Sequence, residues 1–228
     1  MIKFITSSVI LIVYLFLFTS SKSDILSNNN PINIKLDSLP YLGQNPPDTI
    51  PIRFGPSYLI TNGSWGWHGS PKFSPDGKEM FFVKYHFNLP SGNAKMYFMK
   101  DVNGVWTMPA QPSFASDSID NSPVYSPDGN RLYFSSYRTG AMRYYFVTRT
   151  GNSWSQPTML NMTYQSMPGS PGWDFAMTQD STIYFSLYTQ ANGADLYLSR
   201  INNGQYSTFE RLPNQINTAS NEIWPYIS

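Results

Sequence analysis

The residues best suited to chemistry include an aromatic and histidine cluster near the start of the chain. Trp65, Trp67 and His68 lie within "TNGSWGWHGSP". Exposed tryptophans can stack on a sugar ring or a peptide side chain, and a histidine can act as an acid, a base or a metal ligand. The alternative is that the tryptophans pack between sheets and that His68 is a hydrogen-bonded loop residue. His86 is the only other histidine and no HExxH-type spacing is present, so we predict no metal site.

A second group of candidates consists of charged and aromatic residues in loops that correspond to one another. Its members are Asp120, Arg138, Trp173, Asp174 and Glu222. Two carboxylates that converge on one channel could hydrolyse a glycoside, and an arginine could clamp a carboxylate or a phosphate. The alternative is that the acids bond their own backbone and that the arginine pairs with a neighbouring sheet. The sequence has no glycine-rich phosphate loop, nucleophile elbow or zinc signature, and we predict no cofactor.

The composition indicates a folded, strand-rich protein with little net charge. Hydrophobic residues make up 41% of the 228 residues, aromatic residues 16% and charged residues 13%, and the net charge is +1. Disordered chains are poor in aromatic residues, whereas Tyr, Phe and Trp favour strands, and Pro and Gly favour turns. The near-neutral charge gives no basis for a nucleic-acid partner. The chain has no cysteine, so its fold does not depend on disulfides.

An apolar run edged by small residues, "FITSSVILIVYLFLFTSS", follows Lys3. This layout is typical of a secretory signal peptide, and we predict that residues 1–23 are a signal cleaved between Thr19 and Ser23. The apolar core is shorter than the ~20 residues of a spanning helix, so we expect no stable membrane insertion after signal removal. An uncleaved anchor is the alternative. We therefore expect an exported protein, periplasmic or secreted, in which residues 24–50 form an extended N-terminal segment.

The chain contains an internal repeat. "SPKFSPDGKEMFFVKY" (70–85) aligns without a gap to "SPVYSPDGNRLYFSSY" (122–137). A weaker third copy, "WDFAMTQDSTIYFSLY" (173–188), has a turn that is one residue shorter and lacks the glycine. A strand, an Asn/Gly turn and an aromatic residue repeat in step with these copies, at 94–106, 142–154 and 194–206. Each unit of about 50 residues is thus predicted to hold four short antiparallel strands, which is the period of a β-propeller blade. A sandwich with accidental similarity is the alternative.

The Ser-Pro-Asp-Gly turns of the repeat are predicted to be structural. Proline presets φ at the second position of such a turn, aspartate tolerates the third, and glycine takes the last. The residues concerned are Ser74, Pro75, Asp76, Gly77, Ser126, Pro127, Asp128 and Gly129. In a propeller these turns lie on the face opposite the loops that join one unit to the next and the second strand to the third. We therefore expect ligand-binding groups in those loops.

"FSPDGKEMFF" and "YSPDGNRLYF" resemble the WD40-like Pro-Asp repeat of TolB-type propellers, an exported bacterial family. The resemblance covers residues 40–228 and implies a six-bladed ring. We predict an all-β fold in which residues 51–228 form a partial six-bladed β-propeller, with about three four-stranded blades and one strand at each end. The last residues, "EIWPYIS", match the run into the turn, so we expect further blades beyond Ser228. An open arc closed by self-association is the alternative.

Two functions are compatible with these features. The first is a non-catalytic exported propeller that binds a protein, a peptide or a glycan through the face that carries the two loop sets. The absence of a catalytic signature and the aromatic, nearly neutral loops favour it. The alternative is a carbohydrate-active hydrolase that uses loop carboxylates and His68 at the channel mouth. Two acids within about 5–10 Å across the channel would favour the enzyme, and acids turned back onto their own backbone would favour binding.

Overall fold

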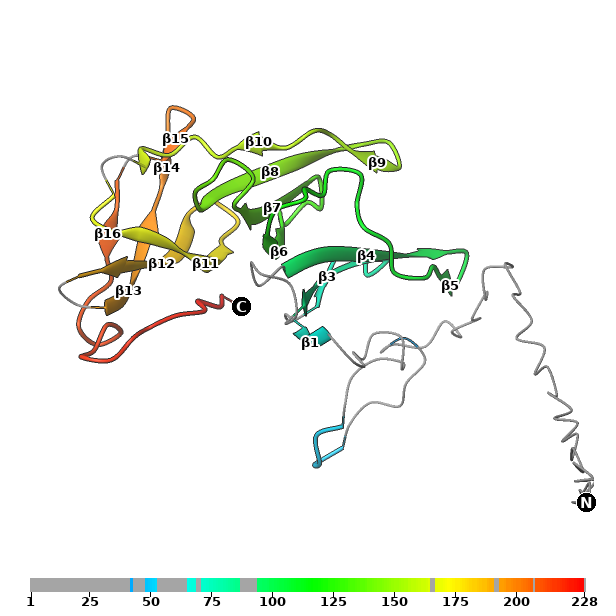
Figure 1. Cartoon of the computed structure of the whole chain (residues 1–228), viewed down its shortest axis with the longest axis horizontal. Helices are drawn as coiled ribbons and strands as arrows, with labels where there is room; N and C mark the ends of the chain where they lie inside the picture. The colour runs from blue at the N-terminus through cyan, green and yellow to red at the C-terminus, as the bar shows by residue number, and fades with distance from the viewer. Residues whose placement is uncertain are drawn as a thin grey trace, which may run out of the picture. The chain divides into compact units, whose positions relative to one another are not determined.

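The computed structural model describes Leu42 and residues 48–52, 65–68, 71–86, 94–164, 167–190, 193–206 and 208–227 (Figure 1). The predicted signal peptide and most of the predicted N-terminal segment and opening strand lie outside these residues. Within the described part of the chain, no helix is both long enough and apolar enough to span a bilayer.

The first unit is an antiparallel sheet of five strands: β1 (Trp65–His68), β2 (Lys72–Phe73), β3 (Glu79–His86), β4 (Ala94–Val102) and β5 (Val105–Trp106). Strands β1 and β2 both pair with β3, so together they form the inner strand of the unit. Strand β3 pairs with β4 along seven residues of each strand. An isolated bridge between Phe98 and Ala110 stands where the other units have an outer strand.

The second and third units each contain the predicted path of four antiparallel strands. In the second unit the order is β6 (Asp120–Tyr125), β7 (Arg131–Ser136), β8 (Arg143–Thr150) and β10 (Thr158–Met159), with β9 (Ser153–Trp154) also paired to β8. In the third unit it is β11 (Ser170–Met177), β12 (Ile183–Thr189), β13 (Gly193–Ser199) and β16 (Glu210–Arg211). A short hairpin of β14 (Ile201–Asn202) and β15 (Gln205–Tyr206) follows β13.

The middle strand of the second unit has buried side chains on both of its faces because both faces are covered. In β7, Leu132 and Phe134 pack in one cluster with Phe81 of the first unit. Tyr133, the residue between them, packs in another cluster with Phe185 of the third unit. Successive side chains of a strand point to opposite faces, so this alternation places a separate core on each side of the second sheet.

Strand β6 packs against β3 and β4 on one side and against β11 on the other. Three successive antiparallel sheets therefore pack face to face, with aromatic residues filling the space between them. This arrangement is the blade packing of a β-propeller. The described residues confirm the predicted all-β, partial-propeller fold.

Two details of the fold differ from the sequence-based expectation. Several candidate residues expected in loops lie in inner strands: Trp65, Trp67 and His68 in β1, Asp120 in β6, and Trp173 and Asp174 in β11. Each inner strand has a shift of register where a loop was expected, so pairing resumes beyond the irregularity. Residues 221–227, expected to form one more inner strand, carry no strand assignment.

Candidate functional site

The two Ser-Pro-Asp-Gly turns have the same hydrogen bonds. In the first turn, the Gly77 amide donates to the Ser74 carbonyl at 2.8 Å and the Ser74 hydroxyl donates to Asp76 Oδ1 at 2.6 Å. In the second, the corresponding distances from Gly129 to Ser126 and from Ser126 to Asp128 are 2.9 and 2.6 Å. Gly77 and Gly129 have φ of 70° and 69°, a region that L-residues other than glycine rarely adopt.

The carboxylates of these turns are held in their ionised form. The hydroxyl of Ser126 and the amide of Asn130 donate to Asp128 and lower its pKa to about 2. Asp76 has the same kinds of donor, from Ser74 and Lys78, and its pKa is also lowered. A carboxylate that accepts several hydrogen bonds and keeps a low pKa is suited to holding a turn together rather than to donating a proton.

The third unit builds the same turn with different residues. Thr178 and Asp180 take the places of the serine and the aspartate, and the Thr182 amide donates to Asp180 Oδ1 at 3.0 Å. Ser181 stands at the glycine position with φ of 65°. The weaker third copy in the sequence therefore keeps the side-chain hydrogen bonds of the turn in one residue fewer, with a serine in the left-handed region.

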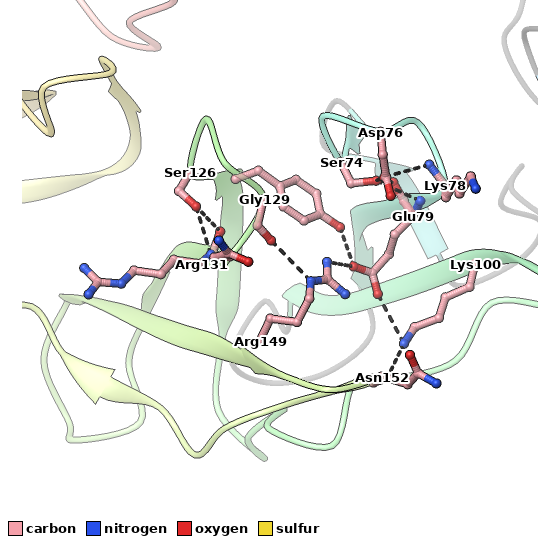
Figure 2. Close-up of polar contacts among 12 residues, drawn as sticks. Ser74, Asp76, Lys78, Glu79, Lys100, Ser126, Gly129, Arg131, Arg149 and Asn152 are labelled. Carbon is pink, nitrogen blue, oxygen red and sulfur yellow. Dashed lines mark hydrogen bonds and ion pairs between the residues drawn. The ribbon is translucent and has the colours of Figure 1, made fainter.

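Next to the first turn lies a buried carboxylate that sequence reasoning did not single out (Figure 2). Glu79 is 4% exposed and opens β3. Its Oε2 accepts hydrogen bonds from Arg149 Nη2 at 2.8 Å and from the Tyr125 hydroxyl at 2.9 Å, both in the second unit. Its Oε1 lies 3.4 Å from Lys100 Nζ, and Lys100 also donates to the Asn152 carbonyl. Glu79 thus joins the first two sheets and is not free to act on a ligand.

Asp120 and Arg138, both predicted as ligand-binding candidates, bind each other within the second unit. Arg138 Nη2 lies 2.9 Å from Asp120 Oδ1, and Asp120 is 1% exposed. The other oxygen of Asp120 accepts hydrogen bonds from the amide and the hydroxyl of Ser116, at 2.7 and 3.0 Å. Because both oxygens have strong donors and the carboxylate is buried, this pair fastens the loop that leads into β6.

Glu222 is bonded in the same manner as Asp120. Its oxygens accept from the Thr218 amide at 3.1 Å and from the Thr218 hydroxyl. The Glu222 amide donates to the Ala194 carbonyl at 2.8 Å. This candidate acid is therefore turned back onto its own loop.

Asp174 differs from the other acids. It lies in the inner strand β11, where Ser122 of the neighbouring inner strand and the side chain of Trp224 donate hydrogen bonds to it. Burial raises the pKa of Asp174 above its ordinary value, although both donors and the charge of Lys72 act in the opposite direction. Among the described acids with an altered pKa, Asp174 has the only raised value.

An aromatic pair lies beside this acid. The rings of Tyr137, which follows β7, and of Trp173, which precedes Asp174 in β11, have centroids 5.2 Å apart and planes tilted by 37°. Tyr137 is 36% exposed, and Trp173 is partly exposed. The two rings come from adjacent units, so the packing of the second sheet on the third creates this surface. Partly exposed Tyr and Trp rings offer a large, rigid contact area with a polar edge, which suits them to binding.

Trp65, Trp67 and His68 form β1, whose side chains lie outside the described part of the structure. The prediction that they bind a ligand therefore stays a prediction. Within the described residues no group of three or more His, Asp and Glu side chains is placed to hold a metal ion.

No protein-family model matches the sequence. Among solved structures, the chain is similar to a proposed TolB from Agrobacterium tumefaciens, with 22% identity over 67% of this chain and 50% of that chain and a TM-score of 0.42. It is also similar to XC5397, a gluconolactonase from Xanthomonas campestris (18% identity, 63% and 47% of the two chains, TM-score 0.42). A Dyadobacter fermentans protein of unknown function matches with 15% identity over 67% and 52% of the two chains, at a TM-score of 0.42. The chain thus spans about half the length of these proteins.

Proposed function

We propose that the protein is an exported, non-catalytic β-propeller that binds a protein, a peptide or a glycan. The binding surface is the end of the blades that carries Tyr137 and Trp173. The observation that carries this proposal is the contact of these two partly exposed rings across the boundary between the second and third units. Aromatic residues at such a boundary provide the kind of contact that dominates many binding interfaces.

The state of the candidate acids supports binding over catalysis. Asp120 is occupied by Arg138 and Ser116, and Glu222 by Thr218. Hydrolysis of a glycoside by the usual pathway needs two carboxylates that both face the substrate. Two of the three candidate acids are instead committed to their own loops. Export is supported by the composition of residues 1–23, and the net charge of +1 argues against a nucleic-acid partner.

The test is a binding screen of the full chain against immobilised glycans and a peptide library, followed by titration of each positive ligand. Trp173→Ala and Tyr137→Ala are expected to weaken binding by about tenfold or more, the effect of removing an aromatic anchor. Ile201→Ala, which shortens an exposed side chain in β14, serves as the matched control. Binding that is unchanged in both aromatic variants would contradict the proposal.

The alternative of a carbohydrate-active hydrolase is favoured by one observation, the raised pKa of Asp174. A protonated carboxyl group is what a general acid requires. A panel of chromogenic glycosides tests this alternative. Hydrolysis that is lost in Asp174→Asn and retained in Trp173→Ala would support the hydrolase over the binding protein.

A further inference from the structure

One position near the start of the third strand holds a different charged residue in each unit. In the aligned segments 94–106, 142–154 and 194–206 it is Lys95, Arg143 and Asp195. Asp195 is bound within the third unit by Arg211, through contacts of 2.8 and 3.0 Å. Lys95 and Arg143 instead contact the loop that leads to the following unit. These two cations therefore lie at the end of the blades that carries the loops between units.

The ammonium group of Lys95 is fully occupied. Its Nζ donates to the carbonyls of Ser116, Asp117 and Ser118, at 3.1, 2.6 and 3.1 Å. A lysine has three N–H donors, so all three are used. Lys95 thus fastens the loop that leads into β6 and has no donor left for a ligand.

The guanidinium of Arg143 is held in place but keeps most of its donors. It lies over the ring of Tyr164, 4.5 Å from the ring centre. The Tyr164 hydroxyl accepts from the Tyr144 amide at 3.0 Å and donates to the Tyr144 carbonyl at 3.4 Å, which fixes the ring against β8. Nη1 of Arg143 donates to the Met142 carbonyl at 2.7 Å. An arginine has five N–H donors, and among the described residues no other acceptor and no carboxylate is bound to this one.

Arg143 lies at the same end of the second unit as the aromatic pair of the proposed binding surface. In the β7–β8 register it faces Ser136, and Tyr137 follows directly in sequence. The ring of Tyr137 in turn contacts that of Trp173 in the third unit. This boundary thus offers two partly exposed rings and a half-buried guanidinium whose donors are available.

We propose that Arg143 determines the specificity of this surface and selects a glycan that bears a carboxylate, such as an oligosaccharide of uronic acids. The planar fork of a guanidinium matches a carboxylate through two parallel hydrogen bonds. Because the sugar rings stack on Tyr137 and Trp173, this role of Arg143 rests on the proposed function. Stacking supplies affinity for the sugar, and the guanidinium distinguishes an acidic sugar from a neutral one.

The pairing of the strands favours a glycan over an acidic peptide. An extended peptide gains much of its affinity from main-chain hydrogen bonds to an exposed sheet edge. Strand β7 is paired with both β6 and β8, and β8 is paired with both β7 and β10. The two strands that flank this surface therefore offer no free edge to a peptide. A sugar acid needs only the ring faces and the charged side chain.

The test measures the binding of the full chain to oligosaccharides of galacturonic, glucuronic and mannuronic acid by isothermal titration calorimetry. Each acid is paired with its methyl ester, which keeps the sugar rings and removes the charge. We expect at least one acid to bind about tenfold or more tightly than its ester. Equal affinity of acid and ester throughout the panel, or binding of no member, would overturn the inference. The proposed function is then decided by the neutral glycans and peptides of its own screen.

Three variants locate the discrimination. Arg143→Gln is expected to lower the affinity for the acid to that for the ester and to leave the ester unchanged, so that binding of the ester also shows that the variant is folded. Arg143→Lys keeps the charge without the fork and should retain only part of the preference. Arg200→Gln, which removes the same charge from an exposed ion pair with Glu210, is the matched control and should keep the full preference. A full preference in Arg143→Gln would overturn the role of Arg143.

Trp173→Ala separates the inference from the proposed function. It is expected to weaken the binding of acid and ester alike, because it removes stacking and no charge. Loss of binding in Trp173→Ala together with an unchanged preference in Arg143→Gln would refute the role of Arg143 and leave the proposed function standing. Binding of an acidic peptide that depends on Arg143, with no binding of the sugar acids, would refute the glycan as the ligand.

Discussion

The turn end of the blades and the inner-strand position of Asp174 both contain hydrogen-bonded aspartates, but the pKa values of these aspartates are shifted in opposite directions. At the turn end, Asp76, Asp128 and Asp180 have matching donors and lowered pKa values in all three units. At the position that Asp174 occupies in β11, the repeat places Ser122 in β6 and Trp224 in residues 221–227. Ser122 and Trp224 each donate a hydrogen bond to Asp174, and the pKa of Asp174 is raised by burial.

The difference shows which positions of the repeat keep the same interactions in every unit and which positions can vary. A turn needs the same hydrogen bonds in every blade, so its residues vary only where another residue reproduces the geometry, as Ser181 does for glycine. The inner-strand position of Ser122 and Asp174 has different neighbours in each unit, so its residue can change without disturbing the sheets. A ligand site is therefore better sought around Asp174 and the residues beside it than among the aspartates that repeat in the turns.

The largest effect is expected from Glu79→Gln, next to the first turn. The change leaves the charges of Arg149 and Lys100 without their carboxylate at a 4%-exposed position, and breaking a buried ion pair costs about 3 kcal/mol or more. Urea denaturation followed by tryptophan fluorescence measures the loss. Glu210→Gln, in the exposed pair with Arg200, is the matched control and should change stability by less than about 1 kcal/mol. Equal effects of the two substitutions would show that Glu79 does not join the first two sheets.

A smaller loss of stability is expected from Tyr144→Phe, which changes a contact close to Asp174. The fully buried Tyr144 hydroxyl donates to the Gly172 carbonyl at 3.0 Å, from the second unit to the third. Its removal leaves a buried carbonyl without this donor, which costs about 1–3 kcal/mol in the free energy of unfolding. The same denaturation experiment applies. A variant as stable as the wild type would mean that this hydrogen bond does not help to hold the second and third units together.

A still smaller effect is expected from substitutions at the glycine position of the turns. Ser181→Gly removes a serine from φ of 65° and is expected to stabilise the protein by up to about 1 kcal/mol. Gly129→Ala is expected to destabilise it by about 1 kcal/mol, since a Cβ at φ of 69° would also lie 3.3 Å from Pro75. Differential scanning calorimetry gives both values. A loss of stability in Ser181→Gly would show that the serine makes a contact that offsets its backbone strain.

The sequence predicted the repeated elements well because each is specified locally. The turn residues and the alternating apolar strands follow from neighbours in the chain, and the structure reproduces them in all three units. Contacts between units could not be predicted in this way. Glu79 and Arg149 are 70 residues apart and have no counterpart of the same charge in the third unit, so no repeat marks them. The aligned pairs Ser116/Asp120 and Thr218/Glu222 were a signal that could have shown the acids to be bonded within their loops.

The pH dependence of stability should carry opposite contributions from the two regions. Asp128 has a folded pKa of about 2, below its ordinary 3.8, so its contribution is present above 3.8 and is lost as the pH falls toward 2. Asp174 has a raised pKa, so the folded state holds its proton more tightly, and stability falls as the pH rises from 3.8 through the folded pKa. Asp128→Asn should therefore flatten the acid limb of the stability curve, and Asp174→Asn should steepen it. The same change in both variants would contradict the assignment.

A carbon-13 NMR titration of the aspartate carboxyl groups, assigned with Asp128→Asn and Asp174→Asn, tests the division between the two regions most directly. The expected result is that the Asp128 carboxyl titrates near pH 2 and that the Asp174 carboxyl titrates above 3.8. Midpoints for both groups at the ordinary value of an exposed aspartate would contradict it, and so would a reversed order.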